Sequence, residues 1–221
     1  MVMMDKIYEL FEYMDLYCER IDPGFLGEPL NMLSSMAYVF VAAAFLWMVK
    51  NKPKDIHYRN MAIIAVSVGA TSTIFHAWPM IFTEFFDLIA VSLFAVYFFW
   101  YAVQKLLNTS PVITWVAMGA LGGAFGACAY FITDENIRNH TMVFGIFAIL
   151  CLMLIDARFR LAKYYAALGL FVAAIASRML DTPLCNMVPI GTHWLWHIFS
   201  AIAVFFLLWV CIDFNSKKET T

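Results

Sequence analysis

The chain has 221 residues, of which 63% are apolar, 17% aromatic and only 14% charged. Soluble domains carry about 25% charged and about 45–50% apolar residues, so this composition excludes an ordinary cytosolic enzyme and a disordered protein. The 14 Lys and Arg residues against 16 Asp and Glu residues give a net charge of −2, which excludes the basic surface that nucleic-acid binding requires.

Long apolar runs, separated by charged residues, Pro, Asn and Gly, predict membrane spans. The mean hydropathy is +0.77, and a helix of about 20 residues crosses a bilayer. We predict an all-α membrane protein with seven transmembrane helices at 31–49, 60–79, 82–105, 111–132, 141–156, 162–179 and 189–212. The chain then divides into an acidic N-terminal segment (1–30), a seven-helix domain (31–213) and a short tail (214–221).

The distribution of positive charges predicts how these spans are oriented. Seven spans put the termini on opposite sides, with four Lys and Arg residues on the N-terminal side and ten on the other. Because cytoplasmic loops carry the excess of Lys and Arg, we expect a cytoplasmic C-terminus and an N-terminus in the periplasm or lumen. Apolar residues at Ile7, Leu10, Phe11 and Met14 predict a short amphipathic helix on the outer face.

Histidines near the outer ends of the spans indicate a metal site, because an ionisable side chain within a span suggests function. His193 and His197 are four residues apart, so both imidazoles project from one helix face. His76, at the outer end of the second span, lies at a similar depth and adds a third nitrogen. Three nitrogens leave one tetrahedral position open, as in catalytic zinc sites. The alternative is a set of histidines that only form hydrogen bonds between helices.

Two other polar residues lie near this expected zinc site. Ser72 precedes His76 by four residues and shares its helix face. Asp87 lies across the short hairpin that follows, where it can approach the open position of the metal. By itself, Ser72 is equally typical of a hydroxyl that packs between helices.

Cys18 and Cys185 both fall on the predicted outer side, a compartment that permits disulfides. A bridge between them would fasten the N-terminal segment to the loop before the last span. The other three cysteines lie within predicted spans, where Cys packs as a small hydrophobic residue.

Three groups of residues, spread in order along the chain, match the motifs of a known family. They are Tyr17-Cys18-Glu19 with Glu28-Pro29-Leu30-Asn31-Met32-Leu33-Ser34; Ser72-Thr73-Ile74-Phe75-His76 with Asp87; and Asp181-Thr182-Pro183-Leu184-Cys185 with His193-Trp194-Leu195-Trp196-His197. This set resembles the alkaline ceramidase family, which belongs to a wider group of seven-span metal hydrolases that includes the adiponectin receptors.

The resemblance implies an intramembrane zinc ion held by His76, His193 and His197. It also implies that Ser72 and Asp87 act on the attacking water or on the oxyanion. The implied activity is a zinc-dependent amide hydrolysis that cleaves ceramide or a related N-acyl lipid into a fatty acid and a sphingoid base. The expected partners are the lipid substrate and the membrane, without nucleic acid or a protein partner, and the expected site lies near the periplasmic or lumenal leaflet.

The resemblance further implies a disulfide and a second metal in the N-terminal segment. The disulfide would join Cys18 to Cys185. The second metal would be a regulatory calcium ion, whose site in the family contains an Asn at the position of Ile21 in this chain. The carboxylates available to this calcium are Asp15, Glu19, Asp22 and Glu28.

Two other classes of protein remain as alternatives: a seven-span receptor or binding protein with a structural metal, and a metal or proton transporter. A transporter is expected to carry ionisable groups at several depths along a path, whereas here they gather at one depth. A receptor is expected to have a sizeable cytoplasmic surface, whereas the predicted cytoplasmic loops and tail are short. Both observations favour an enzyme.

Overall fold

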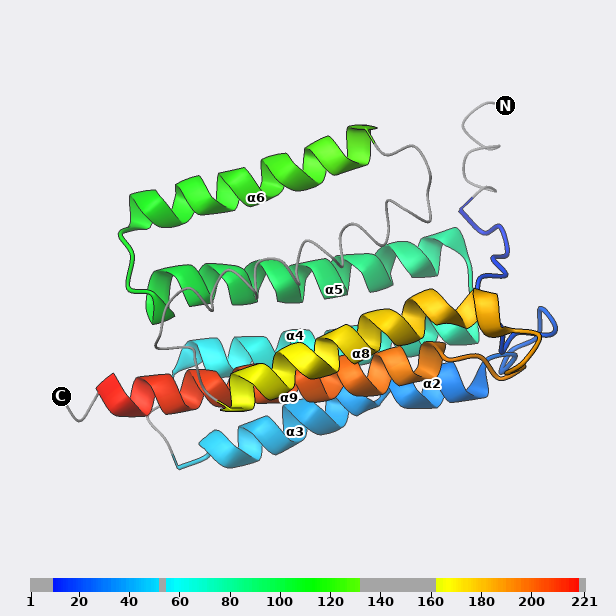
Figure 1. The fold of residues 1–221 in the computed structure, drawn as a ribbon, viewed down its shortest axis with the longest axis horizontal. Coiled ribbons are helices and arrows are strands. Elements are labelled where there is room, and N and C mark those ends of the chain that lie inside the picture. The colour runs from blue at the N-terminus through cyan, green and yellow to red at the C-terminus, as the bar shows by residue number, and fades with distance from the viewer. Residues whose placement is uncertain (1–9, 52–54, 132–161, 219–221) are drawn as a thin grey trace.

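The computed structural model describes residues 10–51, 55–131 and 162–218, and within these ranges the chain is all-helical, without a strand. Figure 1 shows the helices running side by side along the long axis of the molecule. They are α2 (Pro29–Ser35), α3 (Ala37–Val49), α4 (Ile56–Ala77), α5 (Ile81–Tyr101) with its π-helical continuation η1 (Ala102–Leu106), α6 (Pro111–Phe131), α8 (Ala162–Leu184) and α9 (His193–Lys218).

Five helical segments are long and apolar enough to cross a membrane, so the protein is a multi-pass membrane protein. The segments are Pro29–Val49, Ile56–Ala77, Ile81–Leu106, Ala162–Leu184 and His193–Phe214. They correspond to five of the seven predicted spans, with ends that differ by a few residues. The predicted span at 111–132 coincides with α6, whose described apolar part, Pro111–Ala124, is shorter. The predicted span at 141–156 lies outside the described residues, so the number seven stays a prediction.

The centre of the bundle is formed by α4 and α9, each of which contacts α2 and α3. On their other sides, α4 packs against α5 and α9 packs against α8, while α6 contacts α5 and η1. The outward faces keep large apolar side chains, such as Phe40, which is 71% exposed, and Trp47, which is 68% exposed. Such surfaces are typical of helices that face lipid.

Small residues let the central helices approach one another closely. At Gly69 of α4, an added Cβ would lie 3.1 Å from the backbone oxygen of Ser35 and 3.0 Å from a methyl group of Val39. Ala42, Ala65 and other fully buried alanines line the same core. Because of this close contact, α4 lies directly beside α2, the short helix that carries part of the site.

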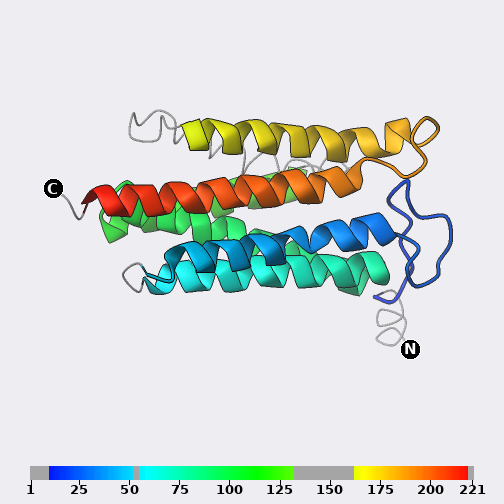
Figure 2. The ribbon, with the colours of Figure 1, turned by 90° about the horizontal axis from the view of Figure 1, so that it is seen from below.

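The N-terminal segment crosses the end of the bundle as irregular chain, so the predicted amphipathic helix is wrong for residues 10–28 (Figure 2). Residues 1–9 lie outside the described residues. Two backbone hydrogen bonds join this segment to the α4–α5 turn and to the first turn of α5. Met14 N donates to Pro79 O at 2.8 Å, and Phe82 N donates to Leu10 O at 2.9 Å.

The predicted disulfide between Cys18 and Cys185 is confirmed, and it ties the N-terminal segment to the end of α8. It joins residues 167 positions apart in the sequence. With the contacts to the α4–α5 turn, it holds the segment over the helix ends where His76 and His193 lie.

Candidate metal centre

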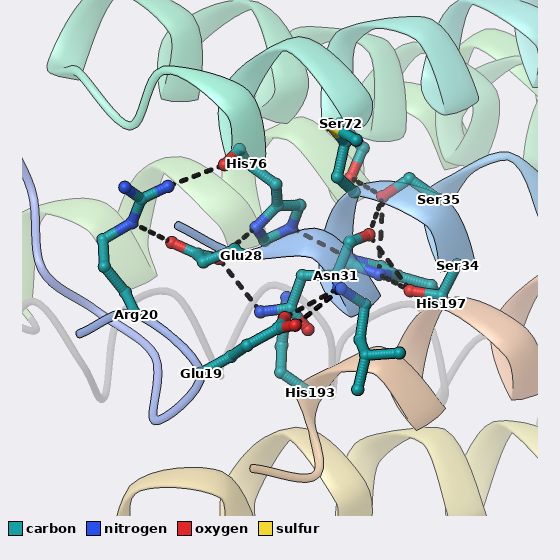
Figure 3. Close-up of polar contacts among 12 residues, drawn as sticks. Glu19, Arg20, Glu28, Asn31, Ser34, Ser35, Ser72, His76, His193 and His197 are labelled. Carbon is teal, nitrogen blue, oxygen red and sulfur yellow. Dashed lines mark hydrogen bonds and ion pairs between the residues drawn. The ribbon is translucent and has the colours of Figure 1, made fainter. Parts of the chain in front are cut away.

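The three predicted ligands come together at one end of the bundle (Figure 3). His76 lies in the last turn of α4, His193 begins α9, and His197 follows one turn later. One ring nitrogen from each residue lies within 4.8 Å of the other two, and the three side chains are 1–3% exposed. Among the described residues this is the one group of His, Cys, Asp and Glu side chains with the spacing of a metal site.

Glu28 determines which nitrogen of His76 carries a proton. The Nδ1 atom of His76 lies 2.6 Å from Oε2 of Glu28, and an ionised carboxylate can only accept hydrogen bonds. Nδ1 of His76 therefore donates, and Nε2 of the neutral ring presents a lone pair. A carboxylate bound to the far nitrogen is typical of metal-binding histidines, whose ring it orients.

Two serines of α2 likewise determine which nitrogen of His197 carries a proton. Its Nδ1 atom lies 2.8 Å from Oγ of Ser34 and 3.4 Å from Oγ of Ser35. Both hydroxyls donate to the backbone oxygen of Asn31, at 3.0 and 2.8 Å. Since a hydroxyl has only one proton, both accept from His197, whose Nε2 atom is then also unprotonated.

The two unprotonated Nε2 atoms of His76 and His197 face each other at 3.2 Å. Two lone pairs at this distance repel unless a positive charge lies between them. Zinc binds His nitrogen at about 2.0–2.1 Å, which separates two tetrahedral ligands by about 3.3 Å. The observed spacing therefore fits a tetrahedral metal ion bound by both rings.

His193 differs from the other two histidines at its Nδ1 atom. Its Nδ1 atom is buried and has no hydrogen-bond partner among the described residues. Buried polar atoms in proteins are rarely left without such a partner. The ring of Tyr17 stacks on the ring of His193, with centroids 3.7 Å apart. Burial raises the pKa of Tyr17 to about 12, so the phenol that covers this histidine is uncharged at neutral pH.

Asp181 of α8 sets the position of His193 through the backbone. One oxygen of its carboxylate accepts from the amides of Thr192 at 2.6 Å and His193 at 2.8 Å, which begin α9. The other accepts from the amide of Cys18 at 3.0 Å. The loop reaches Asp181 because Gly191 has a φ of +66°, and an added Cβ there would lie within 2.3 Å of the carboxylate.

Ser72 lies one turn before His76 on α4 and Asp87 lies on α5, and both predicted catalytic residues bond groups other than the histidines. The Ser72 hydroxyl is buried, 3.0 Å from Oγ of Ser35. Since the proton of Ser35 goes to a carbonyl oxygen, Ser72 is the donor in this pair. Asp87 is half-buried on α5, and its Oδ1 atom accepts from Thr71 of α4 at 3.4 Å. Asp87 does not belong to the metal-binding group.

The four carboxylates expected to bind calcium do not gather into a metal-binding group. Glu19 accepts from the backbone amides of Leu30 and Asn31, at 2.6 and 2.8 Å, and thereby caps the N-terminus of α2. Burial raises the pKa of Glu19, although these two hydrogen bonds oppose the shift. Asp22 accepts from the amide of Gly24 in an exposed turn.

Glu28, the fourth expected calcium ligand, is paired with Arg20. The Nε atom of Arg20 lies 2.6 Å from Oε1 of Glu28, and both side chains are 0–1% exposed. Burial acts to raise the pKa of Glu28, but hydrogen bonds from His76, Arg20 and Asn31 bring it below its usual value. The carboxylates of Glu19 and Glu28 thus already accept from N–H donors of the protein, and the calcium site stays a prediction.

Sequence reasoning missed most residues that support the histidines. The resemblance places Glu28 among the calcium ligands, and the sequence motifs predict no role in the metal site for Arg20, Ser34 or Ser35. A usable signal was present, because Glu28 directly precedes a Pro at the start of a span, and a polar Asn-x-x-Ser-Ser stretch follows within it.

Compared with known proteins, the chain matches no family model and no curated protein. A functional assignment therefore depends on the geometry of the site and on the motifs quoted above.

Proposed function

We propose that this protein is a membrane-embedded, zinc-dependent amide hydrolase of the alkaline ceramidase type. Its substrate is ceramide or a related N-acyl lipid, and its products are a fatty acid and a sphingoid base or similar amine. The observation that carries the proposal is the pair of unprotonated Nε2 atoms of His76 and His197, 3.2 Å apart beside a third buried histidine. Such a set, with three nitrogens and no fourth protein ligand among the residues that the structure describes, is typical of catalytic zinc.

The membrane environment supports a lipid as substrate. The histidines lie at the ends of helices that are apolar enough to cross a membrane, so a substrate with a long apolar tail can reach them from the bilayer. We place this end of the bundle at the periplasmic or lumenal leaflet, with seven spans and a cytoplasmic C-terminus. The bias of Lys and Arg toward the opposite side supports this orientation, as does the Cys18–Cys185 disulfide.

In the proposed reaction, His76, His193 and His197 hold the zinc ion. Bound zinc would polarise the amide carbonyl and make a water molecule acidic enough to attack at neutral pH. Asp87 takes the proton of the attacking water and returns it to the leaving nitrogen. Ser72 turns its hydroxyl from Ser35 toward the substrate and donates a hydrogen bond to the carbonyl oxygen as that oxygen gains negative charge.

The test is metal analysis of the purified full-length protein, combined with fatty-acid release from a panel of N-acyl lipids. We expect about one zinc ion per chain and release of fatty acid from ceramides. A chelator should abolish this release, and added zinc should restore it. His193→Ala should lose both zinc and release. His57, which lies on α4 and bonds Tyr97 at 2.7 Å, gives the matched control His57→Ala, which should keep both.

The same experiment distinguishes the alternative functions. Zinc bound at full occupancy without hydrolysis of any N-acyl lipid would overturn the enzyme proposal and favour a receptor or binding protein with a structural metal. Zinc-dependent transport into sealed vesicles, without hydrolysis, would favour a transporter. Hydrolysis that persists in a zinc-free His193→Ala protein would overturn the role of the metal.

A further inference from the structure

Arg20 is a buried cation that the proposed reaction does not use. Its guanidinium donates from Nε to Glu28 at 2.6 Å and from one terminal nitrogen to the backbone oxygen of His76 at 2.7 Å. The other terminal nitrogen donates to the backbone oxygens of Asp22 and Gly24, at 3.1 and 3.2 Å. Arg20 therefore binds the N-terminal segment, the residue before α2 and the end of α4 at once (Figure 3).

These contacts reach His76 from two directions. One nitrogen of Arg20 holds the backbone of His76, and another holds the carboxylate that binds the Nδ1 atom of its ring. Glu28 is 1% exposed, so it would be costly to keep ionised without a cation beside it. Because the guanidinium is planar and keeps its charge at any physiological pH, it fixes both the charge and the direction of Glu28.

We propose that Arg20 serves as a built-in cation in the position that a calcium ion is expected to fill, and that it positions His76 for metal binding through Glu28. This inference rests on the metal centre of the proposed function. As a consequence, Glu28 is held in place without calcium, and calcium does not change the zinc affinity of the site. Arg20 is a positioning residue, because it touches the support of a ligand and neither the metal nor the substrate.

The charges around Glu28 and Glu19 agree with this assignment. Glu28 has its counter-charge in Arg20, and its second oxygen accepts from His76 and from the side-chain amide of Asn31 at 2.9 Å. Glu19 has both oxygens on the backbone amides of α2. A calcium ion takes six to eight oxygen ligands, and it would have to displace the guanidinium and uncap α2 to obtain them.

The experiment measures zinc affinity of the purified full-length protein by competition with a chromophoric chelator, without any lipid substrate. The variants are Arg20→Met, Glu28→Gln and the double variant, and the matched control is Arg59→Met, which removes an exposed arginine at the other end of α4. Loss of a group that supports a metal-binding histidine weakens metal binding by about 10–100-fold. We expect this loss in both single variants and none in the control.

The double variant separates positioning from mere stabilisation. If Arg20 acts through Glu28, the two losses are not additive, and the double variant binds zinc no more weakly than the weaker single variant. Arg20→Lys keeps the charge but not the planar fork, so it should show a smaller loss, and it replaces Arg20→Met if that variant does not fold. Additive losses, or an Arg20→Met protein with unchanged zinc affinity, would overturn the positioning role.

The calcium arm uses calcium chloride as the probe. After dialysis against millimolar calcium chloride, the wild-type protein should contain no bound calcium, and its zinc affinity and melting temperature should not change. Stoichiometric calcium would overturn the inference. Failure of the proposed function is seen in the wild-type protein alone, before any Arg20 variant is compared. It would appear as a wild-type protein that binds no zinc, or that binds zinc without hydrolysing lipids.

Discussion

The start of α9 depends on one buried carboxylate, and its removal gives the sharpest test of how the site is held. Asp181 is 2% exposed and accepts from three backbone amides, those of Cys18, Thr192 and His193. Asp181→Asn is nearly isosteric, so it changes charge and donor pattern with little change in volume. We expect it to lower both the stability of the protein and its affinity for zinc.

The size of the effect follows from the three hydrogen bonds. A bond to a charged group contributes about 1.5–3 kcal/mol and a neutral one about 0.5–1.5 kcal/mol. In Asp181→Asn, the bonds from Thr192 and His193 become neutral, and the new amide group opposes the N–H of Cys18. The total loss is about 4 kcal/mol, which corresponds to a fall of about 8–16 °C in melting temperature for a chain of this size.

Thermal unfolding of the purified protein, followed by tryptophan fluorescence, measures this change. The matched control is Asp213→Asn on the same bundle, because Asp213 pairs with Lys163 at 2.5 Å while both side chains remain about one-third exposed, at 32% and 31%. An ion pair of this kind contributes about 0–1 kcal/mol, so the control should melt close to wild type. Equal melting temperatures for Asp181→Asn and Asp213→Asn would refute the reasoning.

Three further predictions concern the reaction and the N-terminal segment. Asp87→Asn should keep zinc and lower kcat by about 10²–10⁴-fold, the usual contribution of a general base, and an unchanged kcat in a ceramide-release assay would remove Asp87 from this role. Ser72→Ala should keep zinc and lower kcat by about 10²–10³-fold, as loss of an oxyanion donor does. A lower zinc content with a normal kcat per bound zinc would instead mean that Ser72 only holds Ser35 in place. Cys18→Ser opens the disulfide to Cys185 and should lower the free energy of unfolding by about 2–4 kcal/mol. In thermal unfolding, this variant should match wild-type protein that has been treated with a reductant. A stability equal to that of untreated wild type would mean that the disulfide adds nothing to the other contacts of the segment.

The three histidines could be predicted from the sequence because each obeys a local rule. His193 and His197 share a helix face by their spacing, and helical periodicity fixes that face whatever surrounds it. His76 lies at the end of a neighbouring apolar run, and the topology of antiparallel spans brings that end to the same depth. The disulfide follows from the same topology, because Cys18 and Cys185 fall on one side.

The support of those histidines could not be predicted in the same way, because it depends on contacts without a sequence period. The N-terminal segment has the apolar spacing of an amphipathic helix, yet residues 10–28 form irregular chain. Its Met14 amide donates to Pro79 in the α4–α5 turn, and its Leu10 carbonyl accepts from Phe82 of α5. A spacing rule describes a helix that stands alone on a surface, and it fails where a disulfide and a buried carboxylate fix the chain elsewhere.

The sequence alone also does not determine which partners the carboxylates of this segment have. Glu19 and Glu28 match the pattern of a calcium site. A buried carboxylate, however, can be stabilised either by a positive charge or by N–H donors, and the sequence does not say which of these partners it has. Glu19 receives the first amides of α2, and Glu28 receives a guanidinium. The deciding residue is Arg20, which follows Glu19 directly and, once folded over the bundle end, reaches a carbonyl 56 residues away. With Arg20 on one oxygen of Glu28, the other oxygen holds the Nδ1 atom of His76.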